Sequence, residues 1–154
     1  MSLLDKYNEA MARLRADVND VVHNDMRDGI AVSLVDSAQR RVYDAYSPKY
    51  YERRFTLTDP SHYRFYPTDM GIEVDSPITG NPAYEPPASS GWNPGYISHI
   101  IESGDGYPWF EHGADMKTIG PRPYLSQGLK DYVEDGRANE DLAEGLRARG
   151  YIVE

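Results

Sequence analysis

The sequence contains no cysteine, and this absence excludes a disulfide scaffold, a thiolate-ligated zinc site and a thiol nucleophile. Basic residues are outnumbered, with 16 Lys and Arg against 25 Asp and Glu, for a net charge of −9. Such an acidic net charge disfavours sequence-independent binding to nucleic acid. No apolar run approaches the roughly 20 residues of a membrane span. The beginning of the chain, MSLLDK, lacks the layout of a signal peptide.

Phenylalanine and tryptophan are also scarce, at 3 and 2 residues, whereas tyrosine reaches 13. A tyrosine buries its ring and keeps its hydroxyl for water or a partner, which suits half-buried surfaces and interfaces. With 154 residues, the chain is long enough for one domain with one core. We therefore expect a single acidic domain over residues 1–154, made in the cytoplasm and acting away from membranes.

The first third of the chain has the period of a helix. Ser2 and Asp5 are spaced as a capping box. Asp28 and Gly29 interrupt the pattern, which predicts helical structure over residues 1–46 with a kink or break near Gly29. Two arrangements remain open: an ordinary helical hairpin, or a long helix across a sheet or a neighbouring subunit. The first run of apolar positions is Leu3, Leu4, Tyr7, Met11, Leu14, Val18, Val21 and Val22.

The period changes to two after residue 50, which predicts strands within about residues 53–76, arranged as a three-stranded antiparallel meander. Eight Pro and Gly residues then break every element across residues 77–95. Structureless loops beyond about 12–15 residues are usually functional or flexible. Tyr84 and Trp92 indicate that this loop packs on something, either its own domain or a neighbouring copy.

The last third predicts C-terminal helices within about residues 122–149, after a short helix or strand at residues 97–102. The first of these helices has the apolar face Leu125, Leu129, Tyr132 and Val133. The order of elements predicts an α+β fold, with a long N-terminal helix packed on a small antiparallel sheet.

No motif for nucleophilic catalysis or phosphate binding occurs in the sequence. The four histidines have no metal-ligand spacing, and a loop cluster of Glu111, His112 and Asp115 is better explained as solvated. We expect no enzymatic activity and no catalytic, cofactor-binding or metal site.

Charge is distributed unevenly, with net +1 over residues 47–70 and net −6 over residues 71–120. Opposite patches of this kind pair either within one chain or between copies in a head-to-tail contact, which closes into a ring when the rotation permits. Together with the two loop aromatics, they give the candidate subunit interface. Its residues are Arg53, Arg54, Arg64, Glu73, Asp75, Tyr84, Trp92, Glu102 and Asp105.

Three stretches in this order resemble neck and tail-completion proteins of long-tailed bacteriophages, also labelled head–tail connector or minor tail proteins. They are residues 42–54 (VYDAYSPKYYERR), residues 97–104 (ISHIIESG) and residues 121–125 (PRPYL). The resemblance spans about residues 30–133. It carries over no catalytic residue.

The resemblance implies a structural protein in the neck or tail of the virion. It implies a homo-oligomeric ring of six or twelve copies that contacts adjacent neck, portal-side or tail proteins, with DNA only as passing cargo. The alternative is a small acidic module that binds or inhibits a host protein. Either role agrees with the lack of a catalytic motif.

Overall fold

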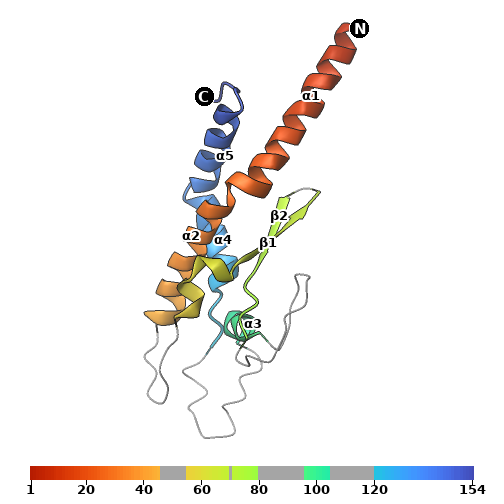
Figure 1. The fold of residues 1–154 in the computed structure, drawn as a ribbon. Coiled ribbons are helices and arrows are strands. Elements are labelled where there is room, and N and C mark those ends of the chain that lie inside the picture. Colours follow the sequence, from red (N-terminus) through yellow and green to blue (C-terminus); the bar gives the residue numbers. More distant parts are fainter. Residues whose placement is uncertain (46–54, 70, 80–95, 105–119) are drawn as a thin grey trace, which may run out of the picture.

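The computed structural model describes residues 1–45, 55–69, 71–79, 96–104 and 120–154. Within them, the chain forms an N-terminal helical segment, a β-hairpin, a short helix and a C-terminal helical pair (Figure 1). This arrangement confirms the predicted α+β class. No helix in these ranges is both long and apolar enough to cross a membrane.

The N-terminal segment is almost continuously helical. Helix α1 (Leu3–Asp20) passes through a π-helical turn, η1 (Val21–Asp25), into α2 (Arg27–Ala38) and a second π-helical turn, η2 (Gln39–Tyr43). The capping box is present: the Asp5 N–H donates to Ser2 Oγ at 3.1 Å, and the Ser2 N–H donates to Asp5 Oδ2 at 2.7 Å. This pairing satisfies two backbone donors at the start of α1.

The change in helix geometry lies at η1 and not at Gly29, where we expected it. Gly29 lies inside α2. A Cβ there would collide with the Asp141 carboxylate and come within 3.1 Å of Tyr132 Cε2. Glycine at this position therefore allows the C-terminal helices to pack closely against α2, because a residue without a side chain leaves room for Asp141 and Tyr132.

The sheet has two strands, β1 (Arg64–Thr68) and β2 (Gly71–Asp75), paired antiparallel with Phe65 opposite Val74. The hairpin lies beside η1, where His23 Nε2 is 3.1 Å from the Thr68 carbonyl and 2.9 Å from the Gly71 carbonyl. Phe65 and Val74 are partly buried against the core. The small sheet is thereby fixed to the N-terminal helical segment.

The first strand of the predicted meander is wrong in its described part. Phe55 has a left-handed backbone with φ 54°, and two 3-10 turns follow, η3 (Thr56–Thr58) and η4 (Pro60–His62). The reason lies at Leu57: its N–H donates to the Tyr43 hydroxyl at 3.1 Å and its carbonyl accepts from the Tyr63 hydroxyl at 2.7 Å. Tyrosine side chains thus satisfy backbone groups that a neighbouring strand would otherwise pair.

Beyond the hairpin, Ile97–Ser103 forms α3, a helix, which decides between the two structures left open for this stretch. Gly104 ends it with φ 75°. Both ends of the predicted loop 77–95 meet here, since the Ile97 N–H donates to the Ile78 carbonyl at 2.8 Å and Thr79 forms a bridge with Tyr96. Most of that loop lies outside the described residues.

The predicted C-terminal helices are confirmed as α4 (Tyr124–Glu134) and α5 (Arg137–Ala148). The expected apolar face of α4 is correct for Leu125, Leu129 and Tyr132. It is wrong for Val133, whose side chain is 63% exposed. The buried residues of α4 are Tyr132 and two that the expected face did not include, Tyr124 and Gly128.

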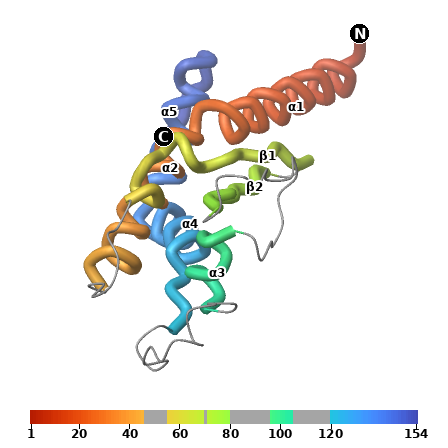
Figure 2. Tube along the Cα trace, turned by 60° about the horizontal axis from the view of Figure 1, so that its bottom comes forward, coloured from red at the N-terminus to blue at the C-terminus, as the bar shows by residue number. Residues whose placement is uncertain are grey.

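The core lies where α4 packs beside α2 (Figures 1 and 2), while α5 packs against η1 and the start of α2. Leu34 of α2 is fully buried there. Glycines allow the close contact: a Cβ at Gly128 would lie 3.0 Å from Leu34 Cδ2, and one at Gly145 would lie 2.5 Å from Val21 Cγ1. Helices α4 and α5 therefore each contact the N-terminal helical segment at a glycine.

Replacement of Gly145 by alanine is expected to lower the free energy of unfolding. Overpacking costs about 1–3 kcal/mol, and against the fully buried Val21 this cost exceeds the gain of about 1 kcal/mol in helix propensity. Gly71→Ala is the control, because a Cβ there meets nothing within 4 Å. Urea titrations that give equal stability for both variants would contradict the tight α5 contact.

Candidate functional site

Five residues of the predicted subunit interface lie outside the described residues: Arg53, Arg54, Tyr84, Trp92 and Asp105. Of the other four, Arg64 and Glu73 are exposed on the β-hairpin, on β1 and β2 respectively. The hairpin therefore presents one basic and one acidic member of the predicted interface at the surface.

The remaining two, Asp75 and Glu102, are engaged inside the chain. Asp75 is buried, and its Oδ1 lies 2.6 Å from His99 Nε2. The same oxygen accepts the Ser76 N–H at 2.7 Å. These bonds connect the end of β2 to α3. We expected the Asp75 carboxylate at a subunit contact, but the fold uses it to hold two of its own elements together.

Glu102 caps the start of α4. Its Oε2 accepts the Leu125 N–H at 2.7 Å and its Oε1 accepts the Ser126 N–H at 3.0 Å and the Ser126 hydroxyl at 2.5 Å. A carboxylate at a helix N-terminus satisfies unpaired N–H groups and interacts favourably with the helix dipole. The Glu102 side chain thereby joins α3 to α4.

A buried polar cluster surrounds the Asp75–His99 pair. The edge of the His99 ring packs on Tyr96, with ring centroids 4.8 Å apart. The Ser98 hydroxyl donates to the Ser76 carbonyl. Tyr124 is fully buried beside Ser76, and burial raises the pKa of its phenol well above the ordinary value. Neutral tyrosine is the form that this environment favours.

The geometry of this polar cluster suits a structural role. A serine nucleophile needs its hydroxyl directed at a base, whereas the Ser98 hydroxyl donates to a backbone carbonyl. Asp75, Ser76, Ser98 and His99 are all buried. Across the described ranges, no three His, Asp or Glu side chains are grouped closely enough to hold a metal ion.

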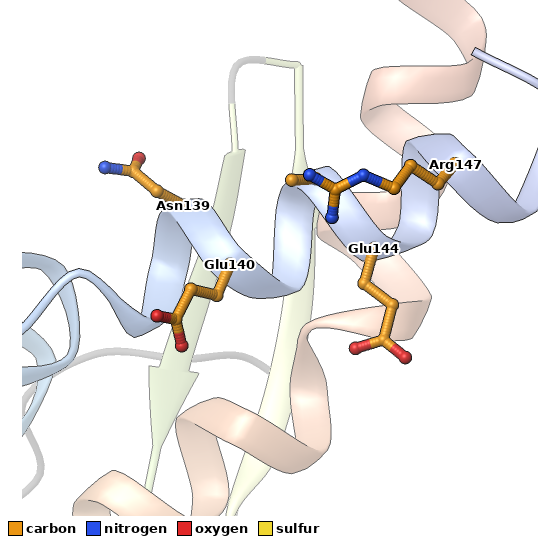
Figure 3. Close-up of a pocket in the computed structure, with 5 residues that line it drawn as sticks. Asn139, Glu140, Glu144 and Arg147 are labelled. Atoms are coloured by element: carbon orange, nitrogen blue, oxygen red, sulfur yellow. The ribbon is translucent and has the colours of Figure 1, made fainter. Parts of the chain in front are cut away.

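A surface depression runs along the outer side of α5 (Figure 3). Its lining comes from this one helix and consists of Asn139, Glu140, Ala143, Glu144 and Arg147. The labelled side chains spread outward from the helix and do not converge on a common point. The arrangement lacks the enclosed apolar walls that bind small ligands.

Helix α1 is largely uncovered and projects from the body in both views (Figures 1 and 2). None of its 18 residues is buried. Its inner end is fixed by Arg149, which pairs with Asp20 and Asp25, and by the Tyr151 hydroxyl, which donates to Asp17 Oδ2 at 2.5 Å. Toward the N-terminus the large apolar side chains are exposed: Leu3, Leu4, Tyr7 and Met11.

Sequence reasoning identified the apolar period of α1 but not its exposure, and it missed the roles of Ser76, His99 and Tyr124. A signal for the roles of His99 and Tyr124 was present, because they lie in residues 97–104 and 121–125, two of the stretches that resemble the phage proteins. These two stretches lie together in the fold, where the Arg122 N–H donates to the Ile101 carbonyl at 2.8 Å. A Cβ at Gly104 would also lie 2.8 Å from the nitrogen of Pro121.

The fold and these sites define a small α+β protein with a structural polar cluster and a largely uncovered first helix. The family model YomN matches residues 6–148, and the chain belongs to the YomN family. YomN is a protein of a Bacillus phage region, so the family makes this a phage-related protein. No curated protein and no solved structure matches the chain.

Substitution of His99 by alanine tests the structural role of the buried pair. Removal of one member of a buried pair is expected to lower the free energy of unfolding by about 3–5 kcal/mol, because the other is left uncompensated. The control is His62→Ala. His62 Nε2 lies 3.7 Å from the Asp59 carboxylate at the surface, and loss of such an exposed pair is expected to lower the free energy of unfolding by about 1 kcal/mol or less. Similar urea midpoints for the two variants would show that the pair does not stabilise the fold.

Proposed function

We propose that this phage-related protein is a structural component of the virion neck or tail. In this role it assembles with copies of itself into a ring at the head–tail junction, and DNA passes through the ring as cargo. The observation that carries the proposal is the uncovered α1. In proteins most of the stability of a helix comes from packing of its apolar face, and none of the 18 residues of α1 is buried.

An assembly supplies that packing. The apolar side of α1 is exposed at Leu3, Leu4 and Tyr7, so a partner that covers it removes a large apolar surface from water. Contiguous exposed apolar patches mark protein interaction sites. The tyrosine count of 13 also supports extensive interfaces, in which tyrosine is enriched.

The charge supports the second part of the proposal. A net charge of −9 per subunit, repeated around a ring, gives a negative potential. Such a surface repels the DNA phosphates and lets the duplex slide instead of binding it. In this proposal the ring lets DNA pass without binding it, and its binding partners are proteins.

The alternative is a small acidic module that binds or inhibits a host protein. The same uncovered helix favours it, because an amphipathic helix can lay its apolar face into a groove of a partner. The two functions differ in where the protein is found after infection and in whether its partner is a copy of itself.

Purified virions are expected to contain the protein in a fixed number of copies, six following the symmetry of the tail or twelve following that of the portal. Quantitative mass spectrometry of virions against a labelled standard measures this number, and native mass spectrometry of the isolated protein detects the ring. Recovery of the protein in the infected-cell lysate on a host protein, with none in virions, would favour the inhibitor instead.

Charge reversal tests the predicted interface. Arg64→Glu, alone or with Arg53→Glu and Arg54→Glu, is expected to reduce ring formation at physiological salt, because like charges then face each other across the contact. Lys130→Glu is the matched control, since that side chain is 58% exposed on α4 and lies outside the predicted interface. Circular dichroism should be unchanged in every variant. Normal ring formation by the triple variant would show that these arginines are not part of the interface.

A further inference from the structure

The outer half of α1 carries a narrow apolar stripe. Leu4, Tyr7 and Met11 are 66%, 61% and 41% exposed, respectively. They recur at three- and four-residue spacing, so they share one face of the helix. The same spacing continues inward through Leu14, Val18 and Val21.

The stripe has the spacing of a helix-packing face over its whole length. Apolar residues that alternate three and four apart are the pattern by which one helix packs against another. At the inner end the partner is visible: Val21 is fully buried where Gly145 of α5 approaches it. Helix α5 ends at Ala148, and α1 continues past it (Figure 1). The apolar spacing that begins at the contact between Val21 and α5 therefore continues, uncovered, toward the N-terminus.

The charges around the stripe fit a second copy of this chain. Residues 1–16 contain three basic and two acidic residues, for net +1, whereas the whole chain carries −9. Asp5, Lys6 and Glu9 lie on the opposite side of the helix at 100° per residue. Two acidic subunits can thus bring their outer α1 segments together with little of the repulsion that their other surfaces impose.

We propose that the α1 helices of two copies pair along this stripe, with contact centred on Tyr7. Tyr7 is the middle residue of Leu4, Tyr7 and Met11, so it meets its own counterpart in parallel helices in register and in antiparallel helices that cross at Tyr7. The proposal rests on the proposed self-assembly and names a contact additional to the charged interface on the hairpin. It applies equally to subunits inside and outside a virion.

Disulfide cross-linking of the full chain tests the pairing directly, because the sequence has no cysteine and an introduced one is unique. Tyr7→Cys is expected to form disulfide-linked dimers rapidly on mild oxidation. Glu9→Cys, also exposed on α1 but opposite the stripe, is the matched control and is expected to cross-link far more slowly. Equal cross-linking rates for the two variants would overturn the proposal.

Sedimentation velocity over a range of concentrations provides the second measurement. Met11→Lys places a charge in the stripe and is expected to weaken self-association by about tenfold or more. Ala12→Lys adds the same charge to an exposed position off the stripe and is expected to leave the dissociation constant nearly unchanged. Both parent residues lie in a helix with no buried residue, so both variants should fold.

The outcomes separate this inference from the proposed function. Rings that form normally in Met11→Lys, with no cross-linking of Tyr7→Cys, would overturn the α1 pairing and leave the virion role standing. Cross-linked α1 pairs in a protein that is absent from virions would support the pairing and overturn the virion role. A monomeric chain at every concentration, with slow cross-linking of Tyr7→Cys, would overturn the pairing and the proposed self-assembly together.

Discussion

The close packing of α2 against α4 is the contact on which the rest of the structure depends. It is possible because Gly128 has no side chain: a Cβ there would lie 3.0 Å from both Leu34 Cδ2 and Ser37 Cβ. The Ser33 hydroxyl donates to the Gly128 carbonyl at 2.8 Å within the same contact. Since α1 and α2 form one nearly continuous helical segment, anchoring α2 in this way also fixes the direction in which α1 projects.

Two carboxylates connect this helical core to the remaining elements. Asp75 ties the end of the hairpin to α3 through His99, and Glu102 ties α3 to the first turn of α4. The resulting chain of contacts gives the small sheet a fixed place even though its own two strands make few bonds. A two-stranded sheet is marginal by itself, so these polar links and the His23 contact with the hairpin turn supply what the strands lack.

Local signals predicted the helices well, and non-local contacts explain the errors. The capping box at Ser2 acts within the first turn of α1 and was predicted correctly. The strand expected around Leu57 failed because the hydroxyls of Tyr43 and Tyr63 bind its backbone. Val133 was predicted to lie on the buried face of α4 but is exposed. The side of α4 that α2 contacts is the side of Gly128. None of these partners is adjacent in the sequence.

The sequence by itself determined the class of fold, the helices toward both ends of the chain and the absence of thiol chemistry, because periodicity, capping and composition depend on neighbouring residues. Only the tertiary structure decided which charges and apolar faces remain at the surface. Asp75 and Glu102 look like surface acids in the sequence, and the stripe of α1 looks like an ordinary core face. Burial is set by what packs against a side chain: for Asp75 and Glu102 the partner comes from a distant part of the chain, whereas no residue of α1 is buried by the described part of the fold.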